Sequence, residues 1–120
     1  MFNYLLVFLG GGLGSMSRYG IAHFMSRHEL DFPLATLLAN AFACIILGAL
    51  FGVSLKENGL HSNYKFLLMT GFCGGFSTFS TFSHETVQLF QSGHTFLAFA
   101  NVVMSLIVCL SCIWIGMKLV

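Results

Sequence analysis

The feature that most constrains this chain is a pair of long segments without a charged residue. Residues 32–55 and 95–117 contain no Asp, Glu, Lys or Arg. A helix needs about 20 mainly apolar residues to cross the hydrocarbon core of a bilayer, and both segments are long enough. Over the whole chain 57% of the residues are hydrophobic and 8% are charged, whereas soluble domains carry roughly 25% charged residues. We therefore expect a membrane protein, which excludes a soluble fold, and the few basic residues form no patch for nucleic acid.

Two further segments complete a predicted set of four transmembrane helices. The first runs from about residue 3 to residue 25, and the third from about residue 63 to residue 91. In the first, Gly10 and Gly14 are small residues four apart, as are Gly11 and Ser15, and this spacing favours close contact with another helix. Four spans use about 80 residues, so the sequence predicts one all-α membrane domain over residues 1–120.

Short polar stretches separate the predicted spans. Arg27, Glu29 and Asp31 mark a turn, and Pro33 suits the first turn of the next helix. The residues from Lys56 to Gly59 close the second span, with the glycine as its stop. Residues 91–94 make a tight connection between the third and fourth spans.

The third segment is the least helix-like of the four. Gly71, Gly74 and Gly75 are followed by five hydroxyl residues between positions 77 and 83, which is a poor composition for a continuous helix. Non-helical backbone at membrane depth is tolerated only where protein or a water-filled cavity receives its polar groups. We predict that this helix is broken near Gly74 and Gly75 and that the break is a functional site.

The basic residues barely distinguish the two membrane faces. With four spans, Lys56, Lys65 and Lys118 lie on one side, and Arg27 lies on the other with Arg18, if Arg18 extends to its nearer interface. Three against two gives almost no positive-inside bias. The chain is therefore expected to insert both ways and to pair as an antiparallel, dual-topology homodimer.

Polar residues within the spans are the candidate functional groups. Thr36, Asn40 and Cys44 recur every four residues and share one face of the second helix, and a similar stripe in the fourth includes Ser105. An unpaired amide in hydrocarbon costs several kcal/mol, so Asn40 either joins helices or serves a pathway. Glu85 is the acid within a span, and such a residue is a functional candidate or an interfacial side chain near a helix end.

Phe79 and Phe82 alternate with hydroxyl residues in the third segment. The edge of a phenyl ring is electropositive, so two edges beside hydroxyl and amide donors favour an anion. Ordinary packing of an aromatic stripe explains the same pattern. Both interpretations stay open at this point.

Three ordered stretches resemble the Fluc (CrcB) family of fluoride channels. Residues 71–85 read GFCGGFSTFSTFSHE, residues 10–19 read GGGLGSMSRY, and residues 32–40 read FPLATLLAN. The likeness extends over essentially the whole chain. It implies an antiparallel homodimer in the bacterial inner membrane, with two fluoride pathways along the subunit interface.

The resemblance also implies roles for particular residues. Phe79 and Phe82 would form a box of phenylalanine rings, Asn40 would donate a hydrogen bond in the pore, and Arg18 would lie at the pore vestibule. A sodium ion at the dimer centre would be held by the backbone carbonyls of Gly74 and Ser77. The polar track along the pore would comprise Thr36, Ser80, Thr81, Glu85 and Ser105. The sequence departs from the family pattern at Asn101, where tyrosine is expected, and at Cys109, where a small hydroxyl residue is usual.

The expected activity is passive export of fluoride, without enzymatic chemistry. The alternative is a small proton-coupled multidrug exporter, which also has four helices and dual topology. That mechanism requires a carboxylate in the first helix, and residues 3–25 contain none. A membrane scaffold without transport activity is a third possibility.

Overall fold

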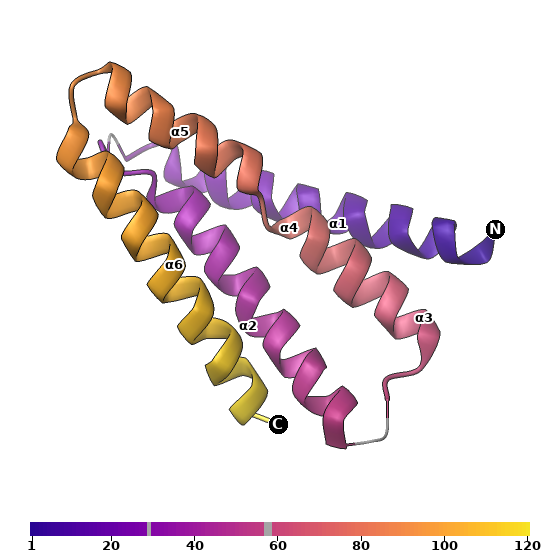
Figure 1. The fold of residues 1–120 in the computed structure, drawn as a ribbon. Coiled ribbons are helices and arrows are strands. Elements are labelled where there is room, and N and C mark those ends of the chain that lie inside the picture. Colours follow the sequence, from indigo (N-terminus) through magenta and orange to yellow (C-terminus); the bar gives the residue numbers. More distant parts are fainter. Residues whose placement is uncertain (29, 57–58) are drawn as a thin grey trace.

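Helices account for the regular structure of this chain (Figure 1). The computed structural model describes residues 1–28, 30–56 and 59–120, and within these ranges it contains no strand. The prediction of an all-α protein is therefore confirmed. Glu29 of the expected polar turn, and Glu57 and Asn58 of the expected second-helix stop, lie outside the described residues. The elements are α1 (Phe2–Met25), α2 (Leu34–Lys56), α3 (Ser62–Tyr64), η1 (Lys65–Cys73), α4 (Gly74–Phe76), α5 (Phe79–Gln91) and α6 (Thr95–Lys118).

Glycines allow α1 to lie against η1 and α4. A Cβ atom added at Gly10 would meet the Leu67 carbonyl oxygen at 2.0 Å, and one at Gly14 would meet the Phe72 oxygen at 2.2 Å. A Cβ atom added at Gly75 of α4 would likewise meet the Gly11 carbonyl oxygen at 2.4 Å. The prediction that this small-residue face packs against another helix is confirmed.

Glycines also allow α2 to pack closely against α6. A Cβ atom at Gly48 would lie 2.2 Å from the Ile113 oxygen, and one at Gly116 would lie 2.3 Å from the Ile45 oxygen. Close backbone approach of this kind is how helices gain van der Waals contact in lipid. Between the two helix pairs, Ala39, Ala43 and Phe76 form a small buried cluster.

The third segment changes its geometry along its length. It is a π-helix from Lys65 to Cys73 and an α-helix from Gly74 to Phe76. Ser77 and Thr78 are extended, with ψ angles of 156° and 121°, and α5 begins at Phe79. Gly74 and Gly75 are thus helical, and the non-helical residues follow them. Gly75 packs closely against α1 at this point, whereas Ser77 and Thr78 leave the helix.

Among the described residues, two helices, α2 and α6, are long and apolar enough to cross a membrane by length and composition. In the most apolar window of α2 28% of the residues are buried, and in that of α6 17% are buried. Core helices of soluble proteins are mostly buried, so these surfaces require another apolar environment. Large exposed side chains such as Phe96 and Leu110 lie on α6, at 82% and 66% exposure.

Pro33 and Gly59 lie just outside the two ends of α2 and help to define where the helix begins and ends. Pro33 precedes the helix, and its carbonyl accepts the Leu37 N–H at 3.2 Å, so the residue lies just before the helix rather than in its first turn. Gly59 has a φ of +116° and donates its N–H to the Ser54 carbonyl. A positive φ of this kind strongly favours glycine, which fits the predicted role of Gly59 as a stop.

Candidate functional site

Asn40 binds the interrupted part of the third segment. Its Oδ1 accepts the Thr78 N–H at 2.7 Å, and its Nδ2 donates to the Thr78 carbonyl at 3.2 Å. The side-chain amide thus replaces partners that a continuous helix would have supplied within itself. One N–H of the Asn40 amide is not used in this pairing, so it can still donate to a ligand.

Thr78 organises the start of α5. Its Oγ1 accepts the Thr81 N–H at 3.2 Å, which is the hydrogen bond of a helix N-cap. The same oxygen lies 3.1 Å from the Thr81 hydroxyl and 3.3 Å from the Ser80 hydroxyl. Thr78 is buried and was not among the sequence-predicted site residues. The sequence pattern that could have identified Thr78 is a threonine close to the predicted break and three residues before another hydroxyl residue, Thr81.

Phe79 and Phe82 lie together beside this cap. Their ring centroids are 5.6 Å apart, with an angle of 40° between the ring planes. Both rings line a cleft of about 280 Å³, which we call the phenylalanine cleft. Its remaining lining residues, from three segments of the chain, are Asn40, Cys44, Ser77, Thr78, Ser105, Leu106, Cys109 and Leu110.

A second cleft of about 260 Å³ lies around Arg18, and we call it the arginine cleft. Thr36, Thr81 and Glu85 line it together with Arg18. The Arg18 Nη1 donates to the Ser77 carbonyl at 3.3 Å. The guanidinium therefore binds the backbone at the helix break rather than extending freely to a membrane surface.

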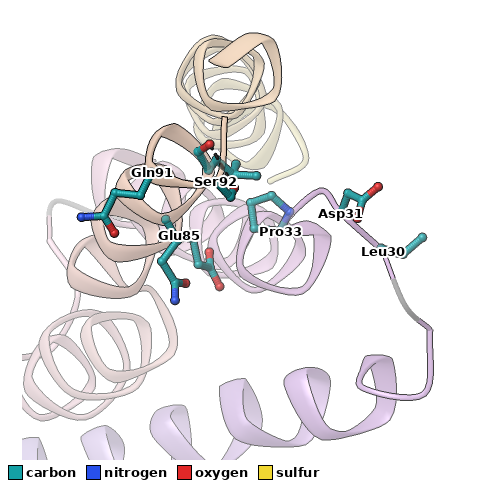
Figure 2. Close-up of a pocket in the computed structure, with 8 residues that line it drawn as sticks. Leu30, Asp31, Pro33, Glu85, Gln91 and Ser92 are labelled. Carbon is teal, nitrogen blue, oxygen red and sulfur yellow. Dashed lines mark hydrogen bonds between the residues drawn. The ribbon is translucent and has the colours of Figure 1, made fainter. Parts of the chain in front are cut away.

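Glu85 stands between the arginine cleft and a larger outer cleft of about 640 Å³. Figure 2 shows the outer cleft, with Asp31 and Pro33 on the segment that leads into α2 and with Gln91 and Ser92 at the end of α5. The Thr36 hydroxyl donates to the Glu85 Oε1 at 2.8 Å. The Glu85 Oε2 is buried without a hydrogen-bond partner among the described residues.

The structure thus brings most of the predicted site residues into two neighbouring groups. One group, at the phenylalanine cleft, comprises Asn40, Phe79, Phe82 and Ser105. The other, at the arginine cleft, comprises Arg18, Thr36, Thr81 and Glu85. The hydroxyls of Thr78 and Thr81 connect the two groups at 3.1 Å. Sequence patterns alone could not indicate this division, because it depends on contacts between distant segments.

Three predicted residues occupy less enclosed positions. Ser80 is exposed beside Thr78. Gly74 is exposed, and a Cβ atom there would meet nothing within 4 Å. Ser77 lines the phenylalanine cleft, but its carbonyl already accepts the Arg18 hydrogen bond.

The chemistry of the phenylalanine cleft suits a small anion. Among the described residues, its lining combines phenyl rings, hydroxyls and an amide, and it contains no Asp, Glu, Lys or Arg. The N-terminus of α5 adds the partial positive charge of unpaired backbone N–H groups. Such donors attract an anion without the permanent counter-charge that would hold it in place.

Comparisons with known proteins agree with this chemistry. A sequence model described as "CrcB-like protein, Camphor Resistance (CrcB)" matches residues 5–117. A protein of Pyrococcus abyssi named fluoride-specific ion channel FluC is 46% identical over 112 residues, which cover 93% of this chain and 90% of that protein. The protein of the same name from Methylobacillus flagellatus is 39% identical over 122 residues, which cover 100% and 95% of the two chains. This chain belongs to the CrcB family.

Proposed function

We propose that the protein is a fluoride-selective channel that lets fluoride leave the cell passively, down its gradient. The observation that carries this proposal is the phenylalanine cleft, where Phe79 and Phe82 lie beside Asn40 without a fixed charge. The fluoride channels named among its relatives support the same conclusion. Conduction of this kind needs no bond-forming chemistry, so we propose no enzymatic activity.

The channel is proposed to cross the bacterial inner membrane with four segments. The apolar and largely exposed surfaces of α2 and α6 support two of these spans. α1 and the composite third segment are of similar length and pack against each other through glycine contacts. At the helix break, the backbone groups of Ser77 and Thr78 bond to Arg18 and Asn40 within the protein. Lipid could not supply hydrogen-bond partners for these groups.

Fluoride binds its water strongly, so a pathway must offer replacement donors that also release the ion. The free N–H of Asn40, the Ser105 hydroxyl and the edges of Phe79 and Phe82 provide several weak donors in one cleft. The Thr78 and Thr81 hydroxyls extend this series toward the arginine cleft. The Thr36 hydroxyl already donates to the Glu85 Oε1, so the proposed part of these two residues in the track is to shape its outer end.

An antiparallel, dual-topology homodimer is proposed to enclose this pathway. The Phe79 side chain is 79% exposed in the single chain, although it lies beside the buried Thr78 at the centre of the third segment. A second copy laid across the break would cover this ring. Four helices of this size leave no enclosed route of their own, so the partner also supplies the missing wall.

Sodium is proposed to bind at the dimer centre through the carbonyls of Gly74 and Ser77. Carbonyl oxygens suit a hard cation. The Thr78 N–H, which a continuous helix would direct to the Gly74 carbonyl, donates to Asn40 instead, and this leaves the Gly74 oxygen available. Arg18 already donates to the Ser77 carbonyl, so a bound cation would compete with that contact. Bound sodium would supply positive charge that holds the two breaks together.

The sodium proposal can be tested by stability alone. Because a bound ion stabilises the folded state by mass action, the purified protein should melt at a higher temperature in sodium chloride than in N-methylglucamine chloride. Equal melting temperatures over a wide sodium range would contradict it.

The test of the function is efflux of fluoride and chloride from vesicles that contain the purified protein. Fluoride efflux should exceed that of empty vesicles, and chloride efflux should not. Phe79→Ile should lower fluoride efflux by about fivefold or more, because it removes a ring whose edge contributes on the order of 1 kcal/mol, while the dimer persists. Equal passage of chloride would contradict selectivity, and an unchanged Phe79→Ile flux would contradict the role of the ring.

The proton-coupled exporter is tested in the same vesicles. α1 of this chain contains no carboxylate, and Glu85 is bound to Thr36 at the end of the arginine cleft. A proton flux that depended on a cationic substrate and disappeared in Glu85→Gln would favour the exporter over the channel.

A further inference from the structure

Asn101 forms a buried polar contact between α6 and α5. Its side chain is 1% exposed, and its Nδ2 donates to the Thr86 Oγ1 at 2.9 Å. Thr86 is also buried, and its hydroxyl donates to the Phe82 carbonyl at 2.8 Å. The two bonds form a chain from α6 to the backbone of a residue whose ring lines the phenylalanine cleft.

The donors and acceptors in this chain fit one arrangement. The Thr86 hydroxyl has one proton, which goes to the Phe82 carbonyl, so its oxygen must accept from the Asn101 amide. The Asn101 Oδ1 accepts in turn from the Ser105 hydroxyl, at 3.4 Å. Hydrogen bonds are usually about 2.9–3.0 Å long when an N–H donates and about 2.7–2.8 Å long when a hydroxyl donates. The contact with Thr86 therefore has the ordinary length, and the contact with Ser105 is loose.

Each end of the network reaches the proposed pathway. A threonine hydroxyl bonded to the carbonyl four residues earlier tends to bend its helix, so Thr86 influences the turn of α5 that carries Phe82. Ser105 lines the phenylalanine cleft, but Asn101 does not. Asn101 thus contacts one residue of the lining directly and another through Thr86, although it does not reach the cleft itself.

We propose that Asn101 is a positioning residue for the anion pathway. Its amide nitrogen fixes Phe82 through Thr86, and its amide oxygen accepts the Ser105 hydrogen bond until an anion in the cleft accepts that hydrogen bond instead. This inference rests on the proposed channel function. It also gives Asn101 a role that differs from the pore lining expected at this position in the fourth segment.

The position of Phe82 can be measured without any transport. With para-fluorophenylalanine in place of Phe82, fluorine NMR reports the surroundings of the ring. Thr86→Val keeps the side-chain shape and removes the hydroxyl, while Asn101→Leu removes the amide. Both should move the fluorine signal, and the double variant should move it no further, because the two residues act in one chain. Thr86→Ser should restore the original signal, and Ser111→Ala, at an exposed position of α6, should leave it in place.

Efflux from vesicles then tests the consequence for the pathway. Because displacement of a positioned group by about 1 Å can cost up to about 100-fold in a rate, we expect fluoride efflux to fall about tenfold or more in Thr86→Val and Asn101→Leu, with recovery in Thr86→Ser. An unmoved fluorine signal in both variants overturns the proposal, whatever the flux. A moved signal with unchanged fluoride efflux overturns its role in conduction. If the original protein carries no fluoride, the proposed function fails while the fluorine signal still decides whether Asn101 positions Phe82.

Discussion

At the scale of single residues, Asn40 shows how one side chain can serve both structure and transport. Its amide bonds to both backbone groups of Thr78, and one N–H remains for a ligand. The two interpretations that its position allowed, a contact between helices and a pore donor, are therefore compatible. A substitution that removes the amide will affect stability and flux together.

We predict that Asn40→Leu destabilises the protein. Leucine has nearly the same shape but leaves the Thr78 N–H and carbonyl unpaired, at a cost of about 1–3 kcal/mol for each buried group. Thermal unfolding in detergent should show a lower melting temperature. Phe51→Leu, at an exposed position of the same helix, is the matched control and should melt like the original protein. Equal stability of Asn40→Leu and the original protein would show that the amide does not support the break.

The sequence singled out the candidate residues, but it could not predict most of their contacts. Phe79 and Phe82 stood out because they alternate with hydroxyls, and they do lie together. The pairing of Asn40 with Thr78 could not be read from the sequence, because it joins a residue of α2 to an extended residue at the helix break, 38 positions further along the chain. Arg18 was expected near a membrane surface or vestibule, but it bonds to the Ser77 carbonyl, and a long flexible side chain does not reveal its partner by its position alone.

At the scale of elements, the third segment depends on α1 for its shape. Glycines of α1 lie against backbone atoms of η1 and α4, so the backbones are in contact without intervening side chains. The small-residue spacing predicted this contact, because closely packed membrane helices require such residues. The π-helix from Lys65 to Cys73 was not predicted, since π and α geometry share similar residue preferences over a short stretch.

We predict that Gly14→Ala disrupts this contact, whereas Gly12→Ala does not. A Cβ atom at Gly14 would lie 2.2 Å from the Phe72 oxygen, but one at Gly12 would meet nothing within 4 Å. Overpacking usually costs about 1–3 kcal/mol, while alanine at an open helical site should stabilise slightly. Melting temperatures of the two variants in detergent should therefore shift in opposite directions. A loss of stability in both would indicate that Gly12 is also covered in the assembled protein.

At the scale of the whole molecule, the position of Arg18 changes the charge balance. Because its guanidinium bonds to Ser77, Arg27, just after α1, is the remaining arginine at that end of the bundle. The three lysines lie at the end of α2, the start of η1 and the end of α6, and these helix ends lie away from the point where α2 begins and α5 joins α6 (Figure 1). Three basic residues at one end then face one at the other, which is a stronger charge bias than the three against two expected from the sequence. The proposed antiparallel dimer needs both orientations in the membrane, so the remaining bias must be small enough to permit them.

Topology labelling measures this directly. Cysteines engineered at the termini of an otherwise cysteine-free protein should react from both sides of intact cells, because one lysine or arginine changes orientation only modestly. Lys65→Gln should move the ratio toward the orientation in which Arg27 is inside. Labelling of every terminus from a single side would contradict the antiparallel dimer.

The pairing of Asn40 with Thr78 also has a consequence for membrane insertion during synthesis. α2 emerges from the ribosome before the third segment, and it carries the amide that the later backbone groups require. Until α2 is in place, residues 77–78 would enter lipid with unpaired polar groups, each at a cost of several kcal/mol. The third segment should therefore remain at the bilayer surface or in the translocon until it meets α2, so the order of the helices along the chain is also the order in which they can assemble.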